Sequence, residues 1–310
     1  MVTKIGVFPA AGGLGGSTVK HLSKQVPASQ LVLIARKPEK LANFQRDGAT
    51  VRQADYDQPS SLETAFDGVD VLMLISYASF ELEHRVKSHR LAIDAALKSG
   101  VKYIFYSSLG FGSGLSDKSV AHVMGAHLET EKYLSSHQDK LPYTAIREGL
   151  YSESFPIYTS YFDPQNPVNE IAIPHSGDGP GVTWVKRDEL GEGTANLIVS
   201  YVNDPVNFQY QNKTVLLSGS REISLAETVE IIGRALGKPL SIREISVDEY
   251  AKLPQIGDNN TYQGVELSKE WATAWQAIRN GETAVVSPTL GEILGREPES
   301  YEQTIKDLLA

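Results

Sequence analysis

The fold of this 310-residue chain is decided near its start by the stretch Phe8-Pro9-Ala10-Ala11-Gly12-Gly13-Leu14-Gly15-Gly16-Ser17-Thr18-Val19. It joins an apolar run of strand length at residues 5–8 to a helical pattern over residues 14–24. Glycines at such a junction allow a tight turn and a close approach of the backbone to a pyrophosphate, which the start of the helix favours. The residues predicted to bind the phosphates of a dinucleotide are Ala11, Gly12, Gly13, Leu14 and Gly15.

Further strand-length runs follow through the first 150 residues, at 31–35, 69–75, 103–106 and 143–146, with a weaker run at 51–55. Helical patterns separate them, beginning near residues 38, 59, 80 and 118. Strands without apolar–polar alternation are typical of a parallel sheet that is covered on both faces. We therefore predict an α/β fold, a doubly wound parallel Rossmann sheet with a smaller, mainly helical C-terminal lobe.

The alternation breaks after residue 149, where residues 151–181 are rich in aromatics, proline and glycine. A strand at 182–185, a helix at 189–201 and a strand at 214–217 are expected to return to the first sheet. Helices are predicted near 225–236, 268–279 and 298–309. The predicted division is a dinucleotide-binding domain over 1–150, joined by 182–218, and a smaller substrate or partner lobe within 151–310.

Composition excludes several classes of function. The chain has no cysteine, which excludes disulfides, zinc thiolates, iron–sulfur clusters and thiol nucleophiles. Its net charge of −9 disfavours direct binding to nucleic acids or membranes, and no apolar run approaches the ~20 residues of a membrane span. Residues 1–150 carry a net charge of +2 and residues 151–310 carry −11, so the first half suits an anionic ligand. A cytoplasmic protein is expected, with access to the nucleus if its role is regulatory.

Residues at strand ends predict how the cofactor is recognised. An NAD site needs an acidic residue about 20 residues past the glycines, but Arg36 and Lys37 stand there and suit the 2′-phosphate of NADP(H). Asp55 and Tyr56 follow the third strand, where an adenine could be hydrogen-bonded and stacked. Ser76 and Tyr77 end the fourth strand and are predicted to face the middle of the cofactor.

Several motifs occur together with the glycine-rich turn in a fixed order. They include Arg36-Lys37, Asp55-Tyr56-Asp57, Tyr106-Ser107-Ser108, His127-x-x-Thr130-Glu131, Arg147-Glu148-Gly149-x-Tyr151 and Asp188-Glu189-Leu190-Gly191, and a tail from Thr289 to Pro298. This combination resembles the NmrA-like family, an atypical branch of the short-chain dehydrogenases. The resemblance covers most of the chain and implies that Gly149 and Tyr151 line the nicotinamide. It also implies one of two functions. The first is an NADPH-dependent quinone or isoflavone-type reductase, and the second is a catalytically silent protein that senses NADP and regulates transcription through a partner.

The proton donor of most short-chain dehydrogenases, a Tyr-x-x-x-Lys motif, is absent: none of the 14 tyrosines has a lysine four residues later. His127 is the best replacement, because it shares a helical stripe with Thr130 and Leu134 that should face the sheet. Its role stays open between catalysis, contact with the cofactor and packing. Ser107 ends the fifth strand. Its hydroxyl either holds a carbonyl oxygen or is a strand-end hydroxyl whose hydrogen bonds are satisfied within the protein.

Other chemistries find no support in the pattern. His84 and His89 are five residues apart rather than four, and no histidine cluster predicts a metal site. The charged residues over 81–90, including Arg85, predict the solvated flank of a helix. The aromatics after residue 150 either cover an apolar planar substrate or form the core of the small lobe. They are Tyr151, Phe155, Tyr158, Tyr161 and Phe162.

Two functions are therefore weighed. The first is an NADP(H)-dependent oxidoreductase that transfers hydride to a small apolar quinone, enone or carbonyl, with His127 or water supplying the proton. The second is a non-catalytic NADP(H) sensor that binds a regulatory protein, which the missing Tyr-x-x-x-Lys favours. The residues do not determine the substrate, the partner or the oligomeric state.

Overall fold

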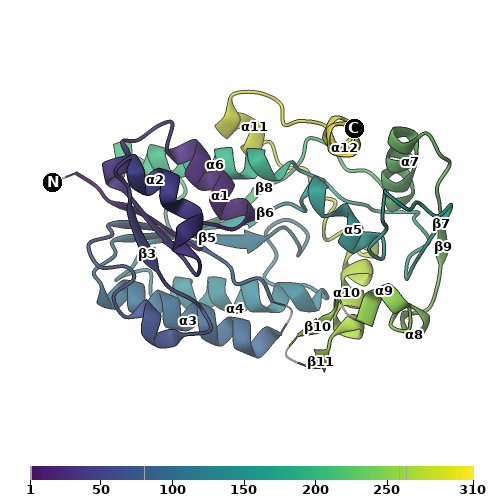
Figure 1. The fold of residues 1–310 in the computed structure, drawn as a ribbon, viewed down its shortest axis with the longest axis horizontal. Coiled ribbons are helices and arrows are strands. Elements are labelled where there is room, and N and C mark those ends of the chain that lie inside the picture. The colour runs from purple at the N-terminus through teal and green to yellow at the C-terminus, as the bar shows by residue number, and fades with distance from the viewer. Residues whose placement is uncertain (1, 80, 258, 263) are drawn as a thin grey trace.

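The computed structural model describes residues 2–79, 81–257, 259–262 and 264–310. Its centre is a seven-stranded sheet in the order β3-β2-β1-β4-β5-β6-β8, in which every neighbouring pair is parallel (Figure 1). The order reverses at β1, as it does in a doubly wound sheet. The strands are β1 (Ile5–Phe8), β2 (Leu31–Ala35), β3 (Thr50–Gln53), β4 (Val71–Ile75), β5 (Tyr103–Leu109), β6 (Tyr143–Glu148) and β8 (Lys213–Leu217).

Helices cover both faces of this sheet. α1 (Gly13–Leu22) and α6 (Arg187–Asn203) lie together on one face, and α3 (Leu82–Lys98) and α4 (His122–Ser136) lie on the other (Figure 1). Neighbouring side chains of β1 point to opposite faces, so Val7 packs in the core under α1 and α6 while Phe8 packs in the core under α3. Both cores are apolar, which explains why the strands read as continuous apolar runs.

A smaller lobe lies at one end of the sheet, at the right of Figure 1. Its main helices are α5 (Phe155–Tyr158), α7 (Leu225–Leu236), α8 (Val247–Tyr250), α9 (Pro254–Gly257), α10 (Ser268–Arg279) and α12 (Tyr301–Leu309). Two small sheets accompany them, β7 (Glu170–Ile173) with β9 (Ser241–Glu244), and β10 (Thr261–Tyr262) with β11 (Val265–Glu266). α11 (Thr289–Leu294) leaves this lobe and packs against α6 and β8. No helix in the described part of the chain is long and apolar enough to cross a membrane.

The predicted fold class is confirmed, but two local predictions are wrong, a helix near residue 59 and a strand at 182–185. The helix expected near residue 59 is only a 3-10 turn, Pro59–Leu62, because the Ser61 hydroxyl bonds to the backbone of Asp55 and Gln58 instead of leaving the turn free to continue. The second helix is also short: a 3-10 turn, Pro38–Leu41, leads into α2 (Ala42–Arg46). The expected start of the fourth helix at residue 80 falls outside the described residues.

The strand expected at 182–185 does not form. Val182 exchanges hydrogen bonds with Ile223, whereas Val185 forms an isolated bridge with Tyr151. Because successive residues pair with different segments, no ladder develops. The segment still leads into α6 and β8, and β8 pairs with β6 at the edge of the main sheet. The division into two domains near residue 150 stays a prediction.

Candidate functional site

The glycine-rich turn lies at the carboxyl end of β1 and starts α1. Gly12 and Gly13 are exposed, Ala11 is half-buried and Leu14 is buried, and nothing lies within 4 Å of the place that a Cβ would occupy on Gly12. The N–H groups of the first helical turn have no helical partner. The turn therefore presents uncovered backbone donors to an anion.

Gly15 allows the helix to begin this close to the strand. A Cβ at this position would overlap the carbonyl oxygen of Pro9 and would lie 3.0 Å from Cδ1 of Ile75. Close packing of helix on strand is the physical reason for a glycine here. The N–H donors of the turn consequently stand directly at the edge of the sheet.

Two free cations stand beside the turn. β2 pairs with β1, and the N–H of Ala10 donates to the carbonyl oxygen of Ile34 at 2.8 Å, so Arg36 and Lys37 follow β2 next to the glycines. Both side chains are exposed, and neither forms an ion pair within the described ranges of the chain. Backbone donors flanked by unpaired cations fit a ligand that carries several phosphates.

The ends of β3 and β4 close the same edge of the sheet. Asp55 is half-buried, and its carboxylate accepts the N–H of Asp57 at 3.1 Å. Tyr56 is only 3% exposed: its ring packs on Phe8, and its hydroxyl donates to the carbonyl oxygen of Ile75 at 2.7 Å. The prediction that an adenine stacks on the Tyr56 ring is therefore wrong, because the protein core already covers that ring.

The segment that ends β4 is held by its backbone. The Ser76 N–H donates to Oγ of Ser107 at 3.1 Å, which gives this buried serine a structural partner. The Tyr77 N–H donates to Nε2 of His89 at 2.8 Å, and the Tyr77 carbonyl oxygen accepts from Nε of Arg85 at 3.1 Å. Residues 76–77 are thus clamped from β5 and from α3.

Arg85 and His89, both on α3, belong to a cluster of buried polar side chains under the edge of the sheet. We call the five residues Arg85, His89, Tyr106, His127 and Thr130 the buried polar cluster. Arg85 Nη2 donates to Nε2 of His127 at 2.9 Å, and the other ring nitrogen of His127 lies 3.1 Å from the Tyr106 hydroxyl. Nδ1 of His89 lies 2.9 Å from Oγ1 of Thr130. The hydrogen bonds therefore connect α3, β5 and α4 around one end of β4.

The geometry of the cluster argues against catalysis, one of the three roles that the sequence leaves open for His127. The imidazole is 3% exposed, and both ring nitrogens already have protein partners. Burial, reinforced by the nearby Arg85 charge, holds the pKa of His127 well below its ordinary value, so the ring is neutral and its one proton faces Tyr106. Of the three roles left open by the sequence, packing within a hydrogen-bonded core is the one that this geometry supports.

The end of β6 is held by a buried ion pair. Arg147 and Glu131 form a two-pronged contact, with Nε–Oε1 at 3.0 Å and Nη2–Oε2 at 2.7 Å. The Ser108 hydroxyl donates to the same carboxylate. Gly149 is buried where β6 passes β8, while Tyr151 is half-buried, so only Tyr151 of these two predicted residues is partly uncovered.

Glu148 is a buried carboxyl with incomplete hydrogen bonding. It is 1% exposed; Oε1 accepts from Thr194 at 3.2 Å and Oε2 has no hydrogen-bond partner among the described residues. Burial raises the pKa of Glu148 well above its ordinary value, which favours the neutral form of the carboxyl.

The aromatics that follow β6 divide between two environments. Phe155, Tyr158 and Phe162 are buried in the apolar core of the small lobe, whereas Tyr151 and Tyr161 are only partly buried. The Tyr161 hydroxyl donates to Asn260 at 3.1 Å. Packing of the lobe therefore accounts for most of this aromatic segment.

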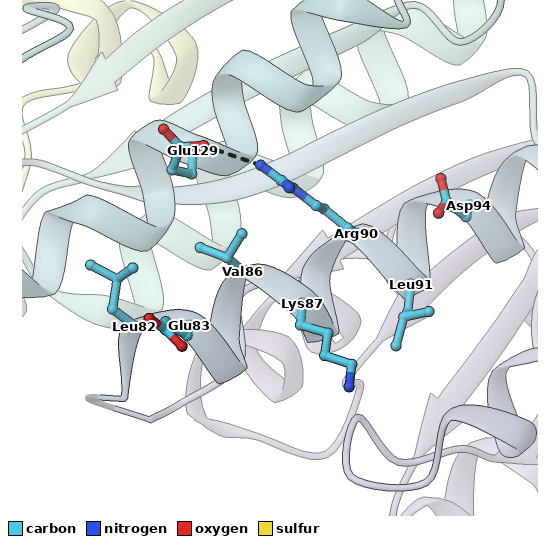
Figure 2. A pocket seen from close by; sticks show the side chains of 8 residues that line it. All are labelled: Leu82, Glu83, Val86, Lys87, Arg90, Leu91, Asp94 and Glu129. Atoms are coloured by element: carbon cyan, nitrogen blue, oxygen red, sulfur yellow. Dashed lines mark hydrogen bonds and ion pairs between the residues drawn. The ribbon is translucent and has the colours of Figure 1, made fainter.

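Elsewhere the described residues contain no group of side chains that could hold a metal ion. A surface pocket of about 500 Å³ lies on the outer side of α3 against α4, lined by residues such as Val86, Arg90 and Glu129 (Figure 2). None of the predicted cofactor residues lines it. The Arg90–Glu129 ion pair spans it at 3.1 Å (Figure 2).

Comparison with known proteins agrees with this arrangement. The model of the NmrA-like family matches residues 1–279. The chain belongs to the NmrA-like family. It is 31% identical over 304 residues to the NmrA-like family domain-containing oxidoreductase flvB of Aspergillus flavus, covering 97% of this chain and 93% of that protein. It is 32% identical over 247 residues to quinone oxidoreductase 2 of Escherichia coli, covering 80% and 79%.

A solved structure is also close to this NmrA-like chain. The crystal structure of the NADPH-dependent quinone oxidoreductase QOR2 of Escherichia coli, complexed with NADPH, superposes with a TM-score of 0.81 at 28% identity. The match covers 99% of this chain and all of the other. The chain is thus an NmrA-like oxidoreductase by family, with the fold of an NADPH-dependent enzyme.

One polar residue of this NmrA-like protein was misjudged from the sequence. Arg85 lies in a run of charged residues that predicts a solvated flank, yet it is 3% exposed and bonds to Tyr77, Val123 and His127. The four-residue spacing to His89 was the available signal, because residues four apart share one face of a helix.

Proposed function

We propose that this protein is an NADPH-dependent reductase that transfers hydride to a small, apolar and electrophilic substrate, with quinones as the preferred class. The observation that carries the proposal is the uncovered glycine turn flanked by the unpaired cations Arg36 and Lys37. The names of QOR2 and of the Aspergillus relative support a reductase.

Residues of the chain have separable roles in this proposal. N–H groups of Gly12, Gly13 and Leu14 bind the diphosphate, and Arg36 and Lys37 hold the 2′-phosphate. The bound cofactor supplies a hydride. The clamped segment at Ser76 and Tyr77 gives the dinucleotide a rigid wall, which orients the reactants.

The choice of quinones follows from the proton balance. Reducing a quinone by hydride gives a hydroquinone anion, and a phenol has a pKa of about 10, so water protonates this anion readily. Reducing a simple ketone gives a far more basic alkoxide, which needs a placed acid. The chain lacks Tyr-x-x-x-Lys, and His127 is buried with both nitrogens occupied. Substrates that leave a stabilised anion are therefore favoured.

The proposal predicts selective turnover. Purified protein supplied with NADPH should oxidise it with benzoquinones and naphthoquinones at least about 100-fold faster than with saturated ketones, since each missing acid–base contact costs roughly 10²–10⁴-fold. The loss of reduced-nicotinamide absorbance measures the rate. Equal rates with quinones and ketones would contradict the argument from the proton balance.

A non-catalytic NADP(H) sensor with a protein partner is the second candidate. The absence of Tyr-x-x-x-Lys together with the buried His127 favours it. Tight NADPH binding with no oxidation by any acceptor in the same panel would select this function over the reductase.

Cofactor choice gives a second prediction. Arg36→Ala should weaken NADPH binding about 10- to 100-fold and leave NADH binding nearly unchanged, because only NADPH carries the phosphate that pairs with the guanidinium. Arg46→Ala is the matched control, since this exposed arginine lies in the same β2–β3 connection and its side chain bonds to Asn43. Dissociation constants from fluorescence titration measure both effects. Equal losses for the two dinucleotides would remove the assignment of Arg36.

A further inference from the structure

Arg187, the first residue of α6, lies against the glycine-rich turn although 174 positions of sequence separate it from Gly13. A Cβ on Gly13 would lie 3.1 Å from Nη1, 3.2 Å from Cζ and 3.2 Å from Nε of this arginine. The guanidinium carbon also lies 6.0 Å from the centre of the Tyr151 ring. The guanidinium therefore stands between the turn and the residue that follows β6.

Arg187 differs from the neighbouring cations in having no acidic partner. Lys186 binds Glu299 at 2.8 Å, and Lys20 binds Asp188 at 3.1 Å. The half-buried Arg187 side chain forms no ion pair or hydrogen bond with any other residue that the structure describes. Its charge is therefore available to a ligand.

The location of this cation is also electrostatically unfavourable for the free protein. The N-terminus of a helix carries partial positive charge, so a cation there lowers the stability of the helix. The backbone N–H of Arg187 donates to the carboxylate of Glu153, at 3.1 and 3.2 Å, and this contact caps the start of the helix. Within the described residues, the carboxylate forms no ion pair with the guanidinium of Arg187. Arg187 is thus an unfavourable charge that faces backbone N–H groups able to bind an anion. Such a local conflict is typical of a functional residue.

Packing between α6 and α1 fixes this position (Figure 1). The Ser17 hydroxyl of α1 donates to Oδ1 of Asp188 at 2.8 Å. A Cβ on Gly191 would overlap the Ser17 side chain, so the two helices are in close contact. The start of α6 consequently cannot move away from the turn without breaking this contact.

We propose that Arg187 binds the diphosphate of the dinucleotide, opposite the N–H donors of the glycine-rich turn. The planar guanidinium offers two parallel N–H donors to two phosphate oxygens. This inference rests on the proposed function only in that the ligand is a dinucleotide; it does not require turnover. The diphosphate is common to NADPH and NADH, so Arg187 serves both, in contrast to Arg36.

Binding of the two dinucleotides tests the assignment. Arg187→Ala should weaken NADPH and NADH by the same factor, about 10- to 100-fold, and Arg187→Lys should recover part of the loss. Competition by 2′-AMP, which lacks the diphosphate, should be unchanged in Arg187→Ala. The adjacent Lys186→Ala is the matched control and should leave both dissociation constants within about twofold, because this lysine is already paired.

Thermal unfolding of the ligand-free protein separates binding from structure. Without ligand, Arg187→Ala should melt at the same or a slightly higher temperature, since a cation leaves the helix N-terminus. A lower melting temperature with proportionate loss of all ligands, 2′-AMP included, would show a structural role and overturn the proposal. Unchanged affinities, or a loss confined to NADPH, would overturn it too. Wild-type protein that binds neither dinucleotide would overturn both this proposal and the proposed function, whereas binding without turnover would leave this one intact.

Discussion

Gly15→Ala should abolish measurable dinucleotide binding and lower the free energy of unfolding by more than about 3 kcal/mol, the upper end of the usual cost of overpacking. The new Cβ would overlap the carbonyl oxygen of Pro9. A backbone oxygen cannot rotate away as a flexible side chain can, so α1 would have to move off β1. That movement displaces the N–H donors of Gly12 and Gly13. Fluorescence titration with NADPH and urea unfolding measure the two effects.

The adjacent glycine provides the control. Gly16 lies in the same helix, and nothing approaches within 4 Å of its Cβ position. Gly16→Ala should keep NADPH binding and raise the stability by about 0.5–1 kcal/mol, because alanine loses less conformational entropy in a helix. A Gly15→Ala protein that binds NADPH with wild-type affinity would show that close packing of helix on strand is not what the turn requires.

Acid should destabilise the protein through the buried polar cluster. Burial, with the Arg85 charge, holds the pKa values of His89 and His127 well below the ordinary value of 6.5. Between that value and the lowered native pKa, the unfolded chain binds more protons than the native protein, so stability is lost as pH falls. For the two histidines together, the loss from pH 8 to pH 5.5 should be about 3 kcal/mol.

The titration of Glu148 opposes this loss of stability at low pH. The contribution of the histidines is therefore measured in a protein without the Glu148 carboxyl. The pKa of Glu148 is raised by burial, so the native protein binds the extra proton above pH 4.5 and gains stability as pH falls. Unfolding should therefore be followed in Glu148→Gln protein, where the histidine effect is no longer offset. Adding His127→Gln should reduce the acid loss by about half, because one of the two buried imidazoles is removed, whereas adding His122→Gln, at the start of the same helix, should not. An imidazole of His127 that titrates near pH 6.5 by NMR would refute the explanation.

Sequence reasoning succeeded where one segment carries its own signal. The apolar runs at β1, β2, β4, β5 and β6, and the turn at Gly12 and Gly13, are local patterns, and the structure has these strands and this turn. Arg36 and Lys37 could be recognised from the sequence because they come directly after a strand. These features depend on hydrophobic period and turn chemistry, which neighbouring residues determine.

The remaining features depend on contacts between distant segments. His127 was placed on the correct face of its helix, but its partner Arg85 lies 42 residues earlier and occupies the nitrogen that a substrate would need. β7 pairs with β9, about 70 residues further on, and four-residue strands carry little pattern of their own. Arg187 and Gly13 are separated by a still longer stretch of sequence. Such contacts are decided by tertiary packing, which a single sequence does not display.

The packing of α6 on α1 has a consequence for synthesis of the chain on the ribosome. The face of α1 that receives Asp188 and Gly191 stays exposed until residues beyond 187 have been made. β6 likewise lacks its outer neighbour until β8 has emerged. A nascent chain of 150 residues therefore holds the glycine-rich turn but neither α6 nor β8, and the dinucleotide site can be completed only after about two thirds of the protein has been translated.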